Sequence, residues 1–280
     1  MTSSLLTPRG RRHIGTTGAG PGAGPVAGPV GSTVGSTAPT RILDWQHPLV
    51  TSLLRQTGMA ADSAAGPGAA AGPFHRMAAL RRAHRRIAST VRPVYSVQDE
   101  RPVSTVLRHG RGSCSQRLAV LESVARASGV ATRVRGLLVD GAFWYPRFPR
   151  LHRIVPDQVL LAWPEFRLAG LSPGVHPTAP WLPVSELFGS LDELSERQGG
   201  GFTNAGAETL FDALSRTAID WDGATLCPAT GPACDLSAHV LADLGHFDSR
   251  DELFAQHGQT LCRTARMLAE PVLGRRSAGT

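Results

Sequence analysis

The chain has 280 residues, of which 41% are hydrophobic, enough for a buried core, and its formal net charge is +7. All 29 basic residues are arginine, which together with abundant Ala, Gly and Pro is typical of a GC-rich genome and weakens the link between positive charge and nucleic-acid binding. The densest basic run, Arg76 to Arg86, fits the solvated face of a helix. We therefore expect no nucleic-acid partner.

The cysteines and the apolar runs exclude further classes of protein. Cys114, Cys227, Cys234 and Cys262 form no CxxC pair, so the spacing predicts no metal site and no cofactor, and a Cys227–Cys234 disulfide stays open. No run of about 18 apolar residues is present, and the first residues lack the apolar stretch of a secretory signal. These features predict a cytoplasmic protein without a membrane partner.

Composition divides the chain into five parts. Residues 1–40 are Gly, Pro, Ser, Thr and Ala with few large apolar side chains, which predicts a disordered tail. Residues 41–57 predict a packed segment, helical after Pro48, and residues 58–73 an Ala/Gly/Pro linker or insertion. Residues 74–200 predict the structured core, and residues 201–280 a helical C-terminal extension.

Hydrophobic periodicity and capping signals predict the elements of these parts. We expect helices over 74–91 and from Cys114 to Gly129, then strands over 130–139, 158–168 and 180–187. Further helices are expected over 208–219, after the capping box that opens at Ser249, and over 260–270, where Pro271 stops the chain. This order is an α+β layout.

Cys114 is the main candidate for a functional residue. It follows Gly112 and Ser113 and opens a helix whose apolar residues recur at three- and four-residue spacing. Unpaired N–H groups and the positive end of the helix dipole are expected to lower the pKa of its thiol. The alternative is a buried structural cysteine.

The order of parts resembles the transglutaminase-like superfamily, whose core is the papain-like cysteine-protease fold. The resemblance covers roughly residues 75 to 190 and rests on Gly112-Ser-Cys114, the helix that follows it, and Gly129-Val-Ala-Thr-Arg-Val-Arg-Gly136, which is similar to the family's "G-I-P-A-R-x-V-x-G". It implies a cysteine-bearing helix packed on a small antiparallel sheet.

Two positions depart from the family's Cys-His-Asp triad. The family's "H-A-W-x-E" strand reads Leu161-Ala-Trp163-Pro-Glu165 here, so leucine stands at the histidine position. The strand "W-x-x-x-D" reads Trp181-Leu-Pro-Val-Ser185, so serine stands at the aspartate position. A leucine cannot accept the thiol proton, and the usual triad is incomplete.

Three hypotheses follow for Cys114. In the first, it is a nucleophile served by another histidine: His152 is the first candidate, with His109 and His176 next and Asp157 to orient the ring, although each also fits a solvated loop residue. In the second, the helix dipole alone activates the thiol. In the third, the chain is a catalytically degenerate scaffold that binds a peptide or protein partner.

An active enzyme would transfer an acyl group through a Cys114 thioester, hydrolysing or forming an amide on a peptide-like or small-molecule acyl substrate. Trp144, Tyr145, Trp163 and Glu165 are the candidate substrate-binding residues, and the Cys114 N–H would meet the oxyanion. The chain's single asparagine, Asn204, predicts either a loop beside Cys114 or, more commonly, a polar loop that caps a helix.

Overall fold

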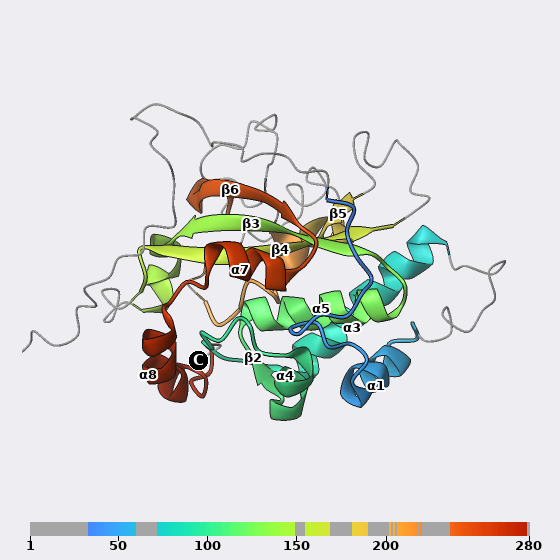
Figure 1. Ribbon diagram of the computed structural model, residues 1–280, viewed down its shortest axis with the longest axis horizontal. Coiled ribbons are helices and arrows are strands. Elements are labelled where there is room, and N and C mark those ends of the chain that lie inside the picture. Colours follow the sequence, from blue (N-terminus) through green and yellow to red (C-terminus); the bar gives the residue numbers. More distant parts are fainter. Residues whose placement is uncertain are drawn as a thin grey trace, which may run out of the picture.

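The computed structural model describes residues 33–59, 72–148, 155–168, 181–189, 206–217 and 236–278, together with residues 202, 204 and 219. A four-stranded antiparallel sheet lies over a layer of helices in this part of the chain, and a short parallel pair of strands accompanies it (Figure 1). The mixture of helices with a small antiparallel sheet confirms the predicted class of secondary structure.

The sheet has the strand order β5-β4-β3-β6. Its strands are β3 (Thr132–Asp140), β4 (Gln158–Arg167), β5 (Trp181–Pro183) and β6 (Val240–Phe247). The parallel pair is β1 (Arg92–Pro93) with β2 (Arg111–Gly112). β3 and β4 pair along their whole length, from Thr132 opposite Phe166 to Asp140 opposite Gln158, so they form the centre of the sheet.

The helices are bounded as follows: α1 (Pro48–Gln56), α3 (Pro73–Thr90), α4 (Val103–His109), α5 (Cys114–Ala127), α7 (Arg250–His257) and α8 (Arg263–Leu273), with the 3-10 segments η1 (Gly141–Arg147), η3 (Val184–Phe188), η4 (Leu214–Arg216) and η6 (Ser237–His239). In Figure 1, α5 lies directly under the sheet, and α1, α3 and α4 lie on its far side. No helix of the described ranges is long and apolar enough to cross a membrane.

Helix α5 begins and ends where local signals place it. The Ser113 side chain accepts a hydrogen bond from the Gln116 N–H, and the Gln116 side chain accepts one from the Ser113 N–H. The two bonds form a capping box. Gly129 takes a φ of 82°, a left-handed conformation that ends the helix. We expected one apolar face, but every residue from Gln116 to Arg126 is buried, because the sheet covers one side and three helices cover the other.

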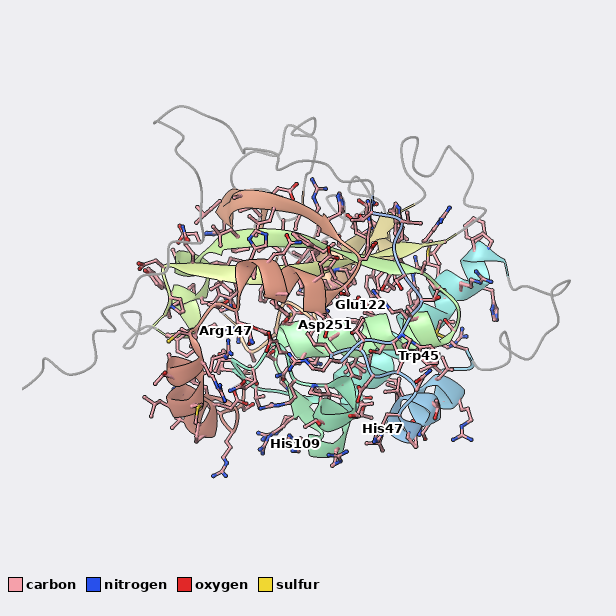
Figure 2. The ribbon with its side chains drawn as sticks, in the orientation of Figure 1. Trp45, His47, His109, Glu122, Arg147 and Asp251 are labelled. Carbon is pink, nitrogen blue, oxygen red and sulfur yellow. The ribbon has the colours of Figure 1, made fainter. Side chains whose placement is uncertain are left out.

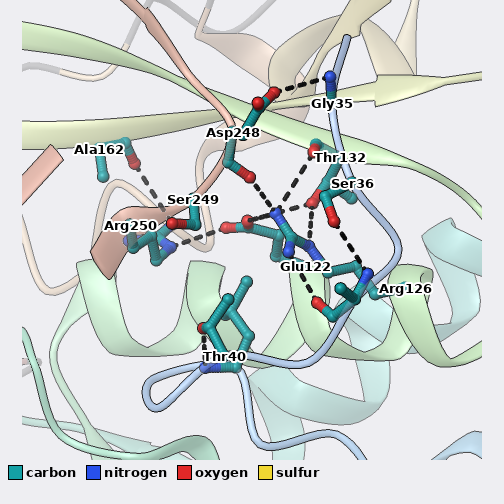
Figure 3. Close-up of polar contacts among 12 residues, drawn as sticks. Gly35, Ser36, Thr40, Glu122, Arg126, Thr132, Ala162, Asp248, Ser249 and Arg250 are labelled. Atoms are coloured by element: carbon teal, nitrogen blue, oxygen red, sulfur yellow. Dashed lines mark hydrogen bonds and ion pairs between the residues drawn. The ribbon is translucent and has the colours of Figure 1, made fainter. Parts of the chain in front are cut away.

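Burial of α5 on all sides encloses charged groups, which pair with one another. Glu122 accepts a hydrogen bond of 2.7 Å from Nε of Arg250, and Nη2 of Arg126 lies 3.5 Å from its other oxygen (Figure 3). Arg126 also donates to the main-chain oxygens of Ala38 and Asp248. The network therefore joins α5 to the start of α7 and to the N-terminal segment.

Strand β6 lies where the sequence predicted helix. Val240–Phe247 pairs with β3 in antiparallel register, with shifts at two points, and Gly245 takes a φ of 85°. The Ala and Leu residues of this segment favour helix by local propensity, but β3 offers an edge of unpaired N–H and C=O groups. Pairing with that edge outweighs the local preference.

Four other segments differ from the prediction. The third strand ends at Pro183 and continues as η3, and the expected helix over 208–219 is a turn followed by η4. Helix α8 runs through Pro271 to Leu273, because proline removes only one hydrogen bond near an exposed helix end. Residues 33–40, predicted as disordered, are ordered: Ser36 forms a β-bridge with Thr132. The predictions for residues 1–32 and for most of the 58–73 linker lie outside the described residues.

Candidate functional site

Cys114 is the first residue of α5 and is held from both directions along the chain. Gly112, two residues before it, belongs to β2, and its carbonyl accepts from the Val94 N–H. A Cβ on Gly112 would lie 2.9 Å from Val106 and 3.2 Å from the Gln116 side chain, so a larger residue would disturb the capping box. This close approach is the structural reason for glycine in the Gly112-Ser-Cys114 motif.

A cavity of about 210 Å³ opens beside Cys114. Cys114 lines it from the helix side and Leu161 from the sheet side. Most of the other lining residues are apolar and include Val94, Phe143, Trp144, Phe148, Val159 and Leu160. The site is therefore an apolar pocket with a small number of polar groups.

Burial raises the pKa of the Cys114 thiol to about 12, and the nearby Asp212 carboxylate acts in the same direction. Arg117 and the hydrogen bond from the Phe211 main chain act against this rise without cancelling it. The predicted lowering of the pKa by the helix N-terminus is thus wrong. The free-energy cost of desolvating a thiolate in apolar surroundings exceeds the stabilisation that the helix dipole gives it. The thiol is therefore protonated at neutral pH.

No histidine lines the cavity among the residues that the structure describes. His109 is exposed at the C-terminal end of α4, away from the cavity, where partial desolvation and neighbouring arginines lower its pKa (Figure 2). His152 and His176 lie outside the described residues, as do Cys227 and Cys234. Asp157 is exposed just before β4 and does not line the cavity.

The candidate substrate-binding residues divide into two groups. Trp144 lines the cavity, and Tyr145, 40% exposed, lies next to it in η1 without lining the cavity. Trp163 is fully buried in β4. Glu165, also buried, accepts from Nε of Arg133 at 2.6 Å. A ligand in the cavity would touch neither Trp163 nor Glu165.

Glu165 is a structural carboxylate. Burial alone would raise its pKa, but His246 of β6 and Arg133 of β3 lower it below its usual range. The carboxylate therefore carries a charge that links three strands. Ser185, which the sequence resemblance aligned with an aspartate, is buried in η3 and does not line the cavity.

The sequence did not predict the two charged residues of the cavity, Asp99 and Arg147, and left Asn204 ambiguous. Asp99 lines the cavity, and burial raises the pKa of its carboxyl to about 6 against the hydrogen bond from Ser115. Arg147 ends η1, within the aromatic and proline-rich loop, and Asn204 also lines the cavity, which favours the cleft-lining interpretation of its loop. Asn204 could be singled out in the sequence because it is the chain's single asparagine. Arg147 could not, because it is one of 29 basic residues.

The described residues contain no group of three or more side chains suited to hold a metal ion. Comparisons of the chain with protein-family models, with characterised proteins and with solved structures find no match.

Proposed function

We propose that the chain is a transglutaminase-like scaffold that has lost the usual triad and binds a small, largely apolar or peptide-like ligand in the cavity beside Cys114. The support for the scaffold is the order of parts: a helix with cysteine at its first position, followed by antiparallel strands β3, β4 and β5, of which β3 and β4 pack against the helix. The amino-acid motifs around Cys114 and Gly129 point the same way.

The observation that carries the proposal is the pairing of Cys114 with Leu161 in one cavity. An aliphatic side chain stands where the family places the proton acceptor, and burial keeps the thiol protonated. Leucine also makes the cavity wall more apolar, which favours binding of an apolar group over chemistry at sulfur.

The size of the cavity supports a small ligand or a single side chain of a peptide. Cavities of about 150 Å³ lined by apolar side chains hold a benzene molecule, and the volume here is about 210 Å³. The space thus accommodates one aromatic ring or a short aliphatic chain.

The pH dependence of iodoacetamide alkylation tests the state of Cys114 in the folded protein, read by peptide mass spectrometry. The proposal expects alkylation to rise steadily with pH and to show no inflection below the ordinary thiol value of about 8.5. An inflection well below that value would overturn the proposal, because it would mean an accessible thiolate. Denatured protein gives the rate for the free thiol.

Binding is tested directly with toluene and indole as apolar probes, by the shift in thermal unfolding temperature and by saturation-transfer NMR. Ligands that bind the folded state alone raise its stability by mass action. Leu161→Phe, which adds volume to the cavity wall, should weaken binding, whereas Leu49→Phe, at an exposed position of α1, should leave it unchanged. Absence of binding by the wild-type protein would contradict the proposal.

Cysteine-dependent acyl transfer is the second candidate, and one observation favours it. Phe148 and Val155 both line the cavity, and the segment that joins them carries His152. If His152 serves as the base, His152→Ala should abolish a low-pH inflection in the alkylation profile of the wild-type protein. A wild-type profile without such an inflection removes this candidate.

A further inference from the structure

One cation lies in the wall of the apolar cavity with an unused donor. Arg147 donates from Nε to Oδ1 of Asn204 at 2.7 Å and from Nη1 to the Ala278 main-chain oxygen at 2.7 Å. Its Nη2 is buried and has no hydrogen-bond partner among the described residues. A buried charged donor without an acceptor is costly, so this nitrogen is a natural position for a ligand atom.

Arg147 is held in place by a second residue under backbone constraint. Asn204 is 5% exposed and has a φ of 57°, the left-handed conformation that residues other than glycine rarely adopt. Its Nδ2 donates to the Phe143 main-chain oxygen at 2.7 Å, while its Oδ1 accepts from Arg147. Constrained conformations of this kind persist where the surrounding structure fixes them and are common at ligand sites.

Several other polar side chains that line the cavity have partners within the described structure, and the Asp99 carboxyl accepts a hydrogen bond from Ser115. Ser113 caps α5, Ser96 bonds Glu270, and Thr260 accepts from the Leu160 N–H. Arg147 is the cavity-lining side chain with a buried nitrogen left unpartnered in this part of the chain. Among the described lining residues, Arg147 is therefore the one positively charged side chain, and Asp99 is the one carboxylate.

We propose that Arg147 binds the carboxylate of the ligand while the apolar cavity holds its body, so that the ligand class is a monocarboxylic acid with one aromatic ring or a short aliphatic chain. This inference rests on the proposed function, since it names the ligand of the same cavity. A single available nitrogen suits a carboxylate oxygen through a charge-assisted hydrogen bond. The carboxylate belongs either to a free acid or to the C-terminal residue of a peptide.

Isothermal titration with phenylacetate and its neutral isostere phenylacetamide, at one ionic strength and pH 7.5, tests the inference. We expect the acid to bind about ten- to a hundredfold more tightly than the amide, the usual worth of a hydrogen bond to a charged group. Arg147→Met should remove this difference and leave the affinity for toluene unchanged. Arg82→Met, which removes an arginine that bonds the Thr57 carbonyl outside the cavity, is the matched control.

A second variant keeps the test valid if Arg147→Met does not fold. Asn204→Gly retains the left-handed backbone and removes Oδ1, so it frees Arg147 and should lower the acid-to-amide ratio without abolishing it. Short peptides ending in phenylalanine, with a free or an amidated C-terminus, separate the two sources of the carboxylate. Tighter binding of phenylacetate than of the free peptide indicates a small acid, and the reverse order indicates a peptide C-terminus.

The outcomes separate failure of this inference from failure of the proposed function. Equal affinities for phenylacetate and phenylacetamide, with toluene bound, would overturn the role of Arg147 and leave the cavity as an apolar binding site. Acid binding that is unchanged in folded Arg147→Met would also overturn it. Failure of toluene, indole, phenylacetate and the peptides to bind would remove the proposed function and this inference with it.

Discussion

At the scale of single residues, the chemistry of Cys114 is set by two opposing effects. The first turn of α5 presents N–H groups that favour a thiolate, and the surrounding apolar wall disfavours it. Burial prevails and raises the pKa of the thiol to about 12. A helix N-terminus is thus not enough to activate a cysteine that lies among apolar side chains.

Replacing Leu161 with histidine should reverse this balance. Leu161→His puts an imidazole into the cavity that Cys114 lines, where it can accept the thiol proton and pair with the thiolate. We expect alkylation of Cys114 at pH 7 to accelerate at least about tenfold. Leu241→His, at an exposed position of β6 that does not line the cavity, is the control. An unchanged rate in folded Leu161→His would contradict the prediction.

The raised pKa of the Asp99 carboxyl predicts that the stability of the folded protein depends on pH. Its pKa is about 6 in the folded protein and about 3.9 in an unfolded chain, so the folded state holds the proton more tightly. Stability from this group is therefore complete below about pH 4 and is lost as the pH rises to about 6. Asp99→Asn, which mimics the protonated form, should match the wild-type protein below pH 4 and exceed its stability above pH 6.

Urea unfolding at pH 4, 5, 6 and 7.5 measures this difference. Asp157→Asn makes the same change of charge at an exposed position and is the control. A constant difference between Asp99→Asn and the wild-type protein across the pH range would show that Asp99 does not titrate as predicted.

At the scale of elements, α5 is a central helix with charges in the core. Glu122, Arg126 and Arg250 are each at most 1% exposed, and they neutralise one another between α5 and the start of α7. Ion pairs of this kind add little net stability over an apolar core, but they make the removal of one partner expensive. The network therefore acts mainly as a specific connection between these helices.

Glu122→Gln should lower the free energy of unfolding by about 3–5 kcal/mol, because two buried arginines then lack their counter-charge. Guanidinium chloride unfolding followed by circular dichroism measures the change. Glu100→Gln removes a carboxylate from a more exposed pair with Arg41 and should cost less than about 1 kcal/mol. Similar effects of the two variants would contradict the proposed role of the network.

At the scale of the whole molecule, the segment from residue 33 to Leu43 ties distant elements together. Gly35 donates to Asp248, Ser36 bridges to Thr132, and Ala38 accepts from Arg126. Further along, the Ile42 carbonyl accepts from the Val103 N–H. The segment thus contacts the sheet, α5, and the starts of α4 and α7, which the chain order alone would keep separate.

Removal of this segment should destabilise the whole molecule. Ile42 and Leu43 are fully buried, and each contributes about 1.5–3 kcal/mol by burial. A variant that begins at residue 44 should therefore unfold at least about 3 kcal/mol more easily than one that begins at residue 33. Urea unfolding of the two variants gives the comparison, and equal midpoints would contradict the prediction.

The sequence by itself determined the elements whose signals are local. The start of α5 at Cys114, its end at Gly129, the capping box of α7 at Ser249 and the strands β3 and β4 all follow from residues within one or two turns of each other. Caps, glycine conformations and hydrophobic periodicity act over that range, so a single chain reveals them.

The tertiary structure decided what depends on residues far apart in the chain. Strand β6 exists because β3 offers an edge about 100 residues earlier. Arg147 meets Asn204 across 57 positions, and the pKa of Cys114 depends on the apolar wall that folding builds around it. Pairing, burial and desolvation are sums over neighbours in space, and no local pattern of residues encodes those neighbours.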